Sequence, residues 1–343
     1  MSQRFASEEL VVADSLEDIN KLFLEKGWSD GLPIMPPTEE AVERMLSGIN
    51  RNPADIIATV PPVWGEATIE KIAINAVMAG CLPDYLPVLI TAVTAMCEEP
   101  VNLYGVQATT HPASILSIIN GPVAKELNIN SNSGAFGPGW RSNATIGRAI
   151  RLILMNIGGA LPGTTDMSTH GQPCKYTFCI AENEEENPWE PLHVERGFAA
   201  SSSTVTVVAA ENPHNINDHC ATTGEEVLTT IVGTITTMGN NNVLLQGGSP
   251  ILALGPEHAA IIAKDGISKD DIKAFIHEKA RIPRRKFFES AIKRYYADLD
   301  EDALIPITPN KEDIIVIVVG GPGKHSSFLP TFGQSRSATR ALA

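Results

Sequence analysis

Aliphatic runs alternate with amphipathic segments along this chain, and the alternation predicts layers of strands and helices. Apolar residues recur at helical spacing in segments 14–26 and 39–46, so we expect a helix in each. Segments 68–79 and 84–97 are apolar on nearly every face, which is typical of helices buried by their neighbours. The β-branched run 204–209 has the composition of a buried strand. Together these patterns predict an α/β fold in which layered sheets carry helices on their faces.

The length of the chain favours more than one structural unit. A chain of 343 residues is long enough for about two domains of ordinary size. We expect an N-terminal helical arm over residues 1–60, a first α/β lobe over 61–197 and a second α/β lobe over 198–343. Residues 243–245 are predicted to begin a further strand in the second lobe.

One pattern occurs three times: an aliphatic run, a glycine–proline step and then polar residues. The segments are 114–127, 250–262 and 314–328, and their steps lie at Gly121, Gly255 and Gly321. Proline directly after a glycine turn suits the first position of a helix, where its missing N–H costs nothing. We therefore expect strand-to-helix joints in the first two segments. The third does not continue with helical spacing, and we expect it to end in a loop, where function more often resides.

The third segment reads IIVIVVGGPGKHSSF and supplies candidates for chemistry. Gly321 and Gly323 can bring backbone N–H groups close to a ligand, and Lys324, His325 and Ser326 add a cation, a titratable ring and a hydroxyl. We predict Lys324 and His325 as catalytic residues and the other three as substrate-binding residues. The spacing does not match the phosphate-binding motif G-x-x-x-x-G-K-[ST], and no G-x-G-x-x-G follows a strand. No nucleotide cofactor is therefore expected.

A second group of candidates follows the strand at 204–209. His214, Asp218 and His219 lie in a loop dense in imidazole, carboxylate and amide groups, which is a usual location for a site in α/β proteins. Three interpretations remain open: a divalent metal site with His111 as a further ligand, acid–base histidines without metal, or structural histidines. The spacing of His214 and His219 is not that of a helical metal-binding pair. We predict His214, Asp218 and His219 as catalytic residues and His111 as substrate-binding.

Further substrate-binding candidates lie in two other loops. Asp30 sits in the turn WSDGLP, which either faces a ligand or only turns the chain. Trp140, Arg141 and Asn143 follow a glycine-rich loop at the start of a predicted helix. Arginines at a helix N-terminus add to its positive dipole, so we expect either an anion or the acidic segment 182–186 to lie there.

Composition excludes several classes of function. The formal charge of −14 opposes a general affinity for nucleic acid or for an anionic membrane, because phosphate groups would be repelled. The N-terminal segment lacks the basic start and apolar core of a secretory signal, and no apolar stretch is long enough to span a bilayer. The five cysteines include no C-x-x-C pair, so neither a disulfide framework nor a zinc ribbon is expected. We expect a cytoplasmic protein.

Several phrases resemble a poorly characterised bacterial family that is grouped with the UGSC-type (seleno)proteins. These phrases include SDGLPIMPPTEEAVERML, AINAVMAGCLPDYLPV, FGPGWRSNATIGRAIRLILMNIGGA, FCIAENEEENPWEPLHVERGF, NPHNINDH and GGPGKHSSFLPTFG. The resemblance implies thiol or selenol chemistry that cleaves carbon–heteroatom bonds. This chain has no U/C-G-S-C motif, and its nearest text is AGC at Cys81.

We therefore carry two functional hypotheses from different classes. The first is an enzyme, of lyase or hydrolase type, that acts on a small polar and anionic metabolite by acid–base or metal-assisted bond cleavage. The second is a non-redox partner subunit of a UGSC-type reductase. A binding protein without chemistry is a third alternative. Large apolar helices also lead us to expect a homo-oligomer.

Overall fold

Two four-stranded sheets face each other at the centre of the molecule. The computed structural model describes residues 5–342. The first sheet has the strand order β12-β5-β3-β4 (Ala338–Ala341, Thr204–Ala210, Ser114–Asn120 and Cys179–Ala181). The second has the order β10-β7-β11-β6 (Ile315–Val318, Ile251–Leu254, His325–Leu329 and His214–Asn217). The pairs β3–β4 and β7–β10 are parallel, and the other pairings within these two sheets are antiparallel.

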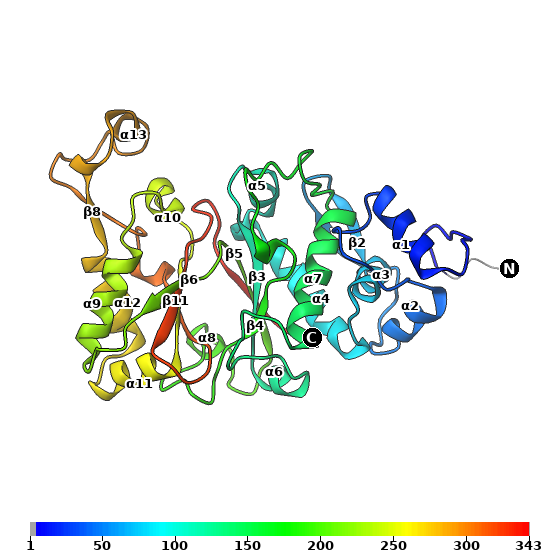
Figure 1. The fold of residues 1–343 in the computed structure, drawn as a ribbon, viewed down its shortest axis with the longest axis horizontal. Coiled ribbons are helices and arrows are strands. Elements are labelled where there is room, and N and C mark those ends of the chain that lie inside the picture. Colours follow the sequence, from blue (N-terminus) through cyan, green and yellow to red (C-terminus); the bar gives the residue numbers. More distant parts are fainter. Residues whose placement is uncertain (1–4, 343) are drawn as a thin grey trace.

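Helices cover the outer face of each sheet, so that the molecule has four layers (Figure 1). The first sheet packs against α4 (Leu86–Met96) and α7 (Arg141–Asn156), and α3 (Ile69–Ala79) packs on both of these helices. The second sheet packs against α9 (Gly224–Ile235) and α11 (Pro256–Lys264), and α12 (Lys269–Lys279) packs on α9. The expected α/β fold with helices on the faces of the sheets is confirmed.

Side chains alternate between the two faces of each strand, and this alternation builds the cores. In β3, Leu116 and Ile118 point toward the opposite sheet, whereas Ile115 joins the core beneath the helices. In β10, Ile317 points toward the opposite sheet and Val316 toward the helices. The two sheets therefore meet through a mostly apolar layer, in which the buried Thr206 of β5 bonds to Thr339 of β12.

The expected boundary between two lobes at residues 197 and 198 runs through the first sheet. β5 pairs with β3 along its full length, and the C-terminal strand β12 pairs with β5. The range 198–343 expected for the second lobe thus contributes two of the four strands of the first sheet. Sequence proximity does not reveal such long-range antiparallel pairing.

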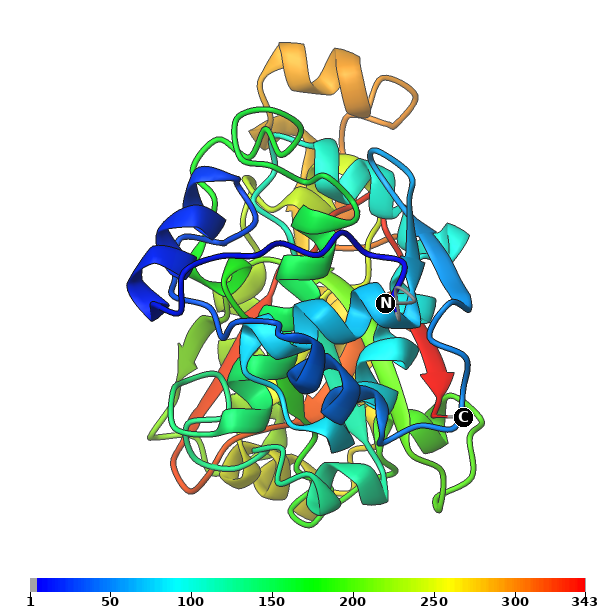
Figure 2. The same cartoon turned by 90° about the vertical axis from the view of Figure 1, so that its right-hand side faces the viewer.

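The N-terminal arm lies over the outer helices of the first sheet (Figure 2). It contains α1 (Leu16–Glu25) and α2 (Glu39–Leu46), the two helices that apolar spacing predicts. Thr38 caps α2 by accepting a hydrogen bond from the N–H of Ala41. A hairpin of β1 (Ile56–Val60) and β2 (Gly65–Thr68) leads into α3.

The remaining elements are short. They are α5 (Leu103–Ala108), α6 (Pro122–Glu126), α8 (Leu192–Glu195), α10 (Asn241–Leu245), β8 (Arg281–Pro283), α13 (Glu289–Tyr295) and β9 (Leu304–Pro306), with five turns of 3-10 helix. α10 shows that the strand expected at 243–245 was wrong, because Asn240 caps a helix there through the N–H of Asn242. No helix among the described residues combines the length and apolar character that a membrane crossing requires.

A buried ion pair fastens the N-terminal arm to α7. Both carboxylate oxygens of Asp30 accept hydrogen bonds of 2.8 Å from the guanidinium of Arg148, which also donates to the carbonyl oxygens of Leu32 and Pro33. The exposed fraction of the Asp30 side chain is only 3%. Asp30, a candidate for substrate binding, is thus used to hold the loop.

Replacing Asp30 by alanine tests this role. Asp30→Ala leaves a mostly buried guanidinium without its acid, so we expect the free energy of unfolding to fall by about 3–5 kcal/mol. Glu40→Ala is the matched control, because it breaks the exposed Arg44–Glu40 pair and should change that free energy by less than about 1 kcal/mol. Urea denaturation measures both. Equal effects of the two variants would contradict the structural role of Asp30.

Candidate functional site

The three glycine–proline steps lie at the carboxyl ends of three strands. Gly121 follows β3 and leads into α6, and Gly255 follows β7 and leads into α11, so the two expected strand-to-helix joints are confirmed. The third step, at Gly321, follows β10 and is succeeded by β11 instead of a helix. The loop expected after this step reaches only to Lys324, and the expectation was wrong for 325–328, because His325–Leu329 pairs with β6 and β7 as strand β11.

A cleft of about 400 Å³ opens at the carboxyl ends of β7 and β10. One wall is the glycine-rich loop 133–137 and the other is the turn 320–323, with Gly255 and residues 325–327 between them. Phe136 gives the cleft an aromatic surface and lies against Phe178. Ligands of open α/β sheets commonly bind in such a position, outside the carboxyl ends of parallel strands.

Two glycines of the cleft lie so close to other parts of the chain that a side chain would not fit. A Cβ atom on Gly255 would lie 2.1 Å from the carbonyl oxygen of His325, and one on Gly321 would lie 1.8 Å from Oγ of Ser133. Gly323 has a φ of +136°, and its N–H donates to a carboxylate oxygen of Glu257 at 2.7 Å. Gly321 and Gly323 thus shape the cleft wall that the sequence predicts.

A pair of histidines stands at the cleft. Nε2 of His325 lies 3.3 Å from Nε2 of His219, and Nδ1 of His325 lies 3.1 Å from Oδ1 of Asn215. An amide oxygen only accepts, so Nδ1 of His325 carries the proton and its Nε2 is the acceptor. Nε2 of His219 is then the donor in the contact between the rings. Both rings are exposed, which leaves them open to solvent and to a ligand.

Asp218 and Lys324 hold the loop that carries His219. Oδ1 of Asp218 accepts from the N–H groups of Cys220 and Ala221, and its Oδ2 accepts from the hydroxyl of Thr230. These hydrogen bonds lower the pKa of Asp218, and the bond from Thr230 has the largest effect. Nζ of Lys324 donates to the carbonyl oxygens of His219 and Ala221. Both predicted catalytic residues therefore position the loop.

His258 lies beneath the site, and no sequence pattern pointed to it. Its ring is fully buried in α11, where Nε2 donates to the carbonyl oxygen of Asp218 at 3.0 Å and Nδ1 lies 2.8 Å from Oγ of Ser326. The Ser326 hydroxyl also accepts from the N–H of Gly255. Burial is the main cause that lowers the pKa of His258, which is consistent with a neutral ring. Ser326 thus connects the cleft wall to His258.

Two predicted histidines lie away from the pair. His214 is opposite Phe328 in the register of β6 and β11, three positions from the pairing of His325 with Asn217. His111 lies 2.7 Å from a carboxylate oxygen of Glu211 and stacks on Phe332. Neither residue lines the cleft.

The candidates at the start of α7 have structural partners. Arg141 donates twice to the carbonyl oxygen of Gly80, and Trp140 is the N-cap residue of α7. Asn143 is buried and bonds to both backbone groups of Asn130. An acid from segment 182–186 was expected at the arginines of α7. Arg148 pairs with Asp30 and Arg151 pairs with Asp166 instead.

Metal ligands and reactive thiols are limited in the described structure. Within residues 5–342, no group of three or more His, Cys, Asp or Glu side chains could hold a metal ion. Burial raises the pKa of Cys81 and Cys97 to about 12 and that of Cys174 to about 11, and it also raises the pKa of Cys179. Only Cys220 is exposed. No family model, curated protein or solved structure matches the chain.

A methyl group at Gly255 tests the close packing behind the cleft. Gly255→Ala must displace the backbone at His325, so we expect the free energy of unfolding to fall by about 1–3 kcal/mol in urea denaturation. Gly233→Ala in α9 is the control, because nothing lies within 4 Å of its Cβ position and alanine favours a helix by up to about 1 kcal/mol. A neutral or stabilising Gly255→Ala variant would refute the contact.

His258 gives the folded protein a pH dependence of known sign. Below about pH 6.5 the unfolded chain gains a proton at His258 that the folded protein takes up only at lower pH. The free energy of unfolding should therefore decrease as the pH is lowered through this range, by up to about 1.4 kcal/mol per pH unit from this residue. Urea denaturation at pH 7.5 and 5.5 should show a smaller loss for His258→Gln than for the unmodified protein. His277→Gln, at a surface position, should retain the full loss.

Proposed function

We propose that this protein is an enzyme that binds a small polar, anionic metabolite in the cleft and cleaves one of its bonds by acid–base chemistry. The observation that carries the proposal is the contact between His219 and His325 at a cleft built from glycine turns. A volume of about 400 Å³ is within the range of small-molecule sites. The cleft combines an aromatic surface with a titratable ring, which is the usual composition of such a site.

His325 is the base in this proposal and His219 exchanges its proton with solvent. The bond from Nδ1 of His325 to Asn215 leaves the one lone pair of the ring on Nε2, where the acidic proton of the ligand would take the place of the N–H of His219. His219 is exposed, so once displaced by the ligand its ring can turn to solvent and accept the proton of His325 on its unprotonated nitrogen, Nδ1, before releasing a proton to water. Asp218 and Lys324 keep the loop of His219 in place.

The charged group of the metabolite would bind through backbone and hydroxyl groups. Among the described residues, no lysine or arginine lines the cleft. The N-terminus of α11 begins at Gly255 on the cleft wall, where the helix dipole favours negative charge, and a ligand anion would compete there with Glu257, whose carboxylate accepts from the N–H of Gly323. Ser327 adds a hydroxyl at the same wall. These groups support binding of one carboxylate or phosphate.

Lyase or hydrolase chemistry is favoured over hydride transfer. No dinucleotide fingerprint follows a strand, and acid–base cleavage needs no cofactor. Four thiols with raised pKa values, two of them buried and two partly buried, also leave little thiol chemistry within the chain itself. That observation equally supports the second candidate, a non-redox partner of a UGSC-type reductase that supplies the sulfur or selenium. Five free cysteines support a reducing compartment, the cytoplasm.

We further propose that a projecting arm makes the contacts of a homo-oligomer. The segment from β8 through α13 to β9 extends from the body (Figure 1). It exposes Phe288, whose side chain is 78% accessible, together with Leu299 and Leu304. Basic residues at 284–286 would meet the negative charge of another copy.

Replacing the two histidines tests the enzymatic proposal. A panel of small carboxylates and phosphate monoesters is first screened by NMR for binding and then for conversion. For a converted compound, His325→Gln should lower kcat about 10²–10⁴-fold, because the base is lost. His219→Gln should lower it less, because water can replace the relay.

His277→Gln is the matched control, since His277 lies on the surface of α12 and bonds to the carbonyl oxygen of Pro309. It should leave kcat unchanged. Full activity of His325→Gln would refute the proposal. Activity that appears only with an added reductase would favour the partner-subunit alternative.

A further inference from the structure

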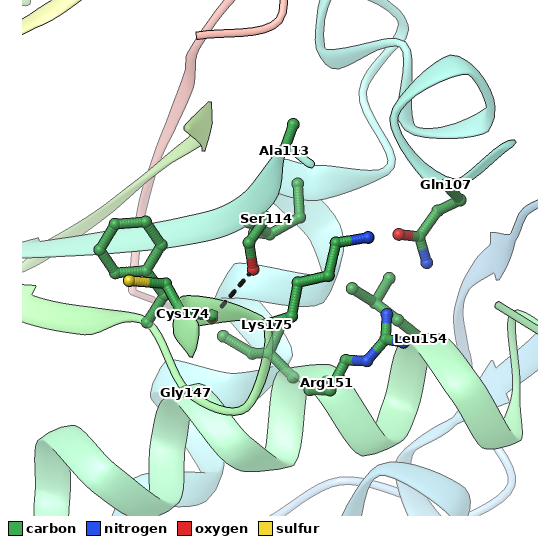
Figure 3. Close-up of a pocket in the computed structure, with 11 residues that line it drawn as sticks. Gln107, Ala113, Ser114, Gly147, Arg151, Leu154, Cys174 and Lys175 are labelled. Atoms are coloured by element: carbon green, nitrogen blue, oxygen red, sulfur yellow. Dashed lines mark hydrogen bonds between the residues drawn. The ribbon is translucent and has the colours of Figure 1, made fainter. Parts of the chain in front are cut away.

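A second cavity is enclosed at the opposite ends of the strands. Its volume is about 10 Å³, which is room for one water-sized particle. It lies beside Ser114, the first residue of β3, whereas the larger cleft lies beyond the carboxyl ends of strands. Figure 3 shows Lys175, Arg151 and Gln107 gathered around it from three different segments of the chain.

Hydrogen-bond donors at this cavity outnumber their partners. Gln107 is 95% buried, and its Nε2 has no partner among the described residues. Of the guanidinium nitrogens of Arg151, only Nη2 forms hydrogen bonds within residues 5–342, to the carbonyl oxygen of Ala160 and to Asp166, both at 3.3 Å. Nζ of Lys175 donates to both carboxylate oxygens of Asp166. Among these three residues, Gln107 Nε2 is the donor that is both buried and unpaired within residues 5–342, and buried donors normally have acceptors.

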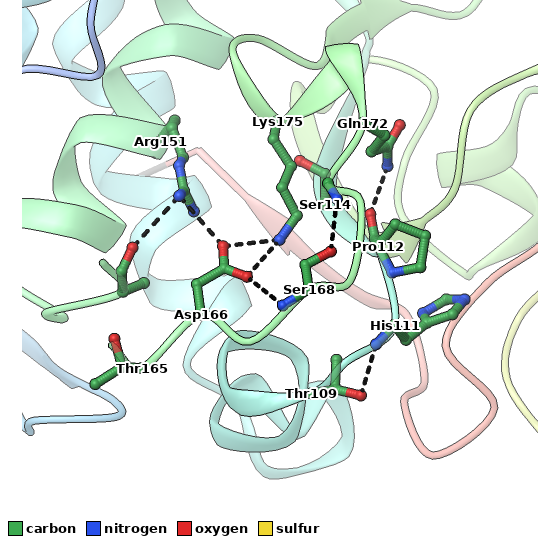
Figure 4. Close-up of polar contacts among 12 residues, drawn as sticks. Thr109, His111, Pro112, Ser114, Arg151, Thr165, Asp166, Ser168, Gln172 and Lys175 are labelled. Carbon is green, nitrogen blue, oxygen red and sulfur yellow. Dashed lines mark hydrogen bonds and ion pairs between the residues drawn. The ribbon is translucent and has the colours of Figure 1, made fainter. Parts of the chain in front are cut away.

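Positive charge is also in excess around the cavity. Asp166, with an exposed fraction of 5%, is shared between Arg151 and Lys175 (Figure 4). The nearby Arg148 is balanced by Asp30. One carboxylate therefore serves two cations whose side chains are only 11% and 13% exposed. Burial is the main cause that lowers the pKa of both Arg151 and Lys175, which means that each charge lacks full compensation.

We infer that this cavity binds one monovalent anion of halide size, with chloride as the physiological example. Arg151, Lys175 and the Gln107 amide would donate to it, and its single negative charge would balance the excess cation. The cavity has room for about one water-sized particle, which suits an anion of one atom better than a carboxylate or phosphate. Leu154 and Phe178 form an apolar part of the wall, which lowers the local dielectric constant and strengthens the electrostatic attraction.

The proposed anion would lie between three segments of the chain. Arg151 belongs to α7, Lys175 to the segment before β4, and Gln107 to α5. An anion bound to all three would connect these segments at the amino end of β3. Binding to the native state alone stabilises that state in proportion to the ligand concentration and affinity.

The experiment replaces sodium gluconate stepwise by sodium chloride at constant ionic strength and measures Tm of the full chain. Gluconate is too large for the cavity, so chloride should raise Tm by about 2–4 °C. A crystal grown with bromide should show an anomalous peak beside Nζ of Lys175.

Two variants and a control separate a bound anion from a general salt effect. Lys175→Gln removes the excess charge, and Gln107→Leu fills the cavity while keeping the charges; both should abolish the chloride dependence. Lys125→Gln, which changes an exposed lysine, should retain it. An unchanged Tm in chloride, or an ordered water in place of a bromide peak, would overturn the inference. The bromide test needs no variant and so holds even if Lys175→Gln does not fold.

Discussion

The apolar contact between the two sheets is the interaction on which the rest of the structure depends. Residues such as Leu116 and Ile118 of β3 meet Ile317 of β10 across this layer, and all three are fully buried. Burying apolar surface stabilises a protein by roughly 25 cal/mol per Å². Because this layer is mostly apolar, few polar groups are available inside it. The candidate site and the small second cavity accordingly lie at opposite ends of the strands.

Packing of the sheets also brings distant turns together. The side-chain amide of Asn183, just after β4, donates to the carbonyl oxygen of Gly320, just after β10. The N–H of Gly320 in turn donates to the carbonyl oxygen of Ser131. The carboxyl ends of parallel strands from both sheets therefore share one edge, and the cleft forms where their glycine turns meet. β11 then returns along β7 and places His325 beside the loop that carries His219.

Sequence patterns predicted the turns of the site better than its side chains. The repeated glycine–proline step located the joints, and the unusual ending of the third copy identified His325, Ser326 and Gly323. Whether a polar side chain faces a cleft depends on register and on backbone acceptors, which no local pattern reports. Lys324 is directed to the carbonyl oxygens of a neighbouring loop. His214 lies three register positions from His325.

Residues whose partners are distant in sequence were the ones that patterns could not predict. His258 reads as an ordinary polar residue of an amphipathic helix, yet it bonds to positions 40 and 68 residues away. β12 returns to the first sheet after more than 120 residues in which the second sheet is built, because an antiparallel edge of β5 is available there. Both outcomes follow from satisfying buried polar groups once the sheets have packed.

The central claim is that His325 presents an unprotonated Nε2 to the proton of His219. Long-range ¹H–¹⁵N NMR spectra of the histidine rings at neutral pH test it directly. The account predicts that His325 is protonated at Nδ1 and not at Nε2, and that His219 is protonated at Nε2. A His325 ring protonated at Nε2 with a bare Nδ1 would contradict the account.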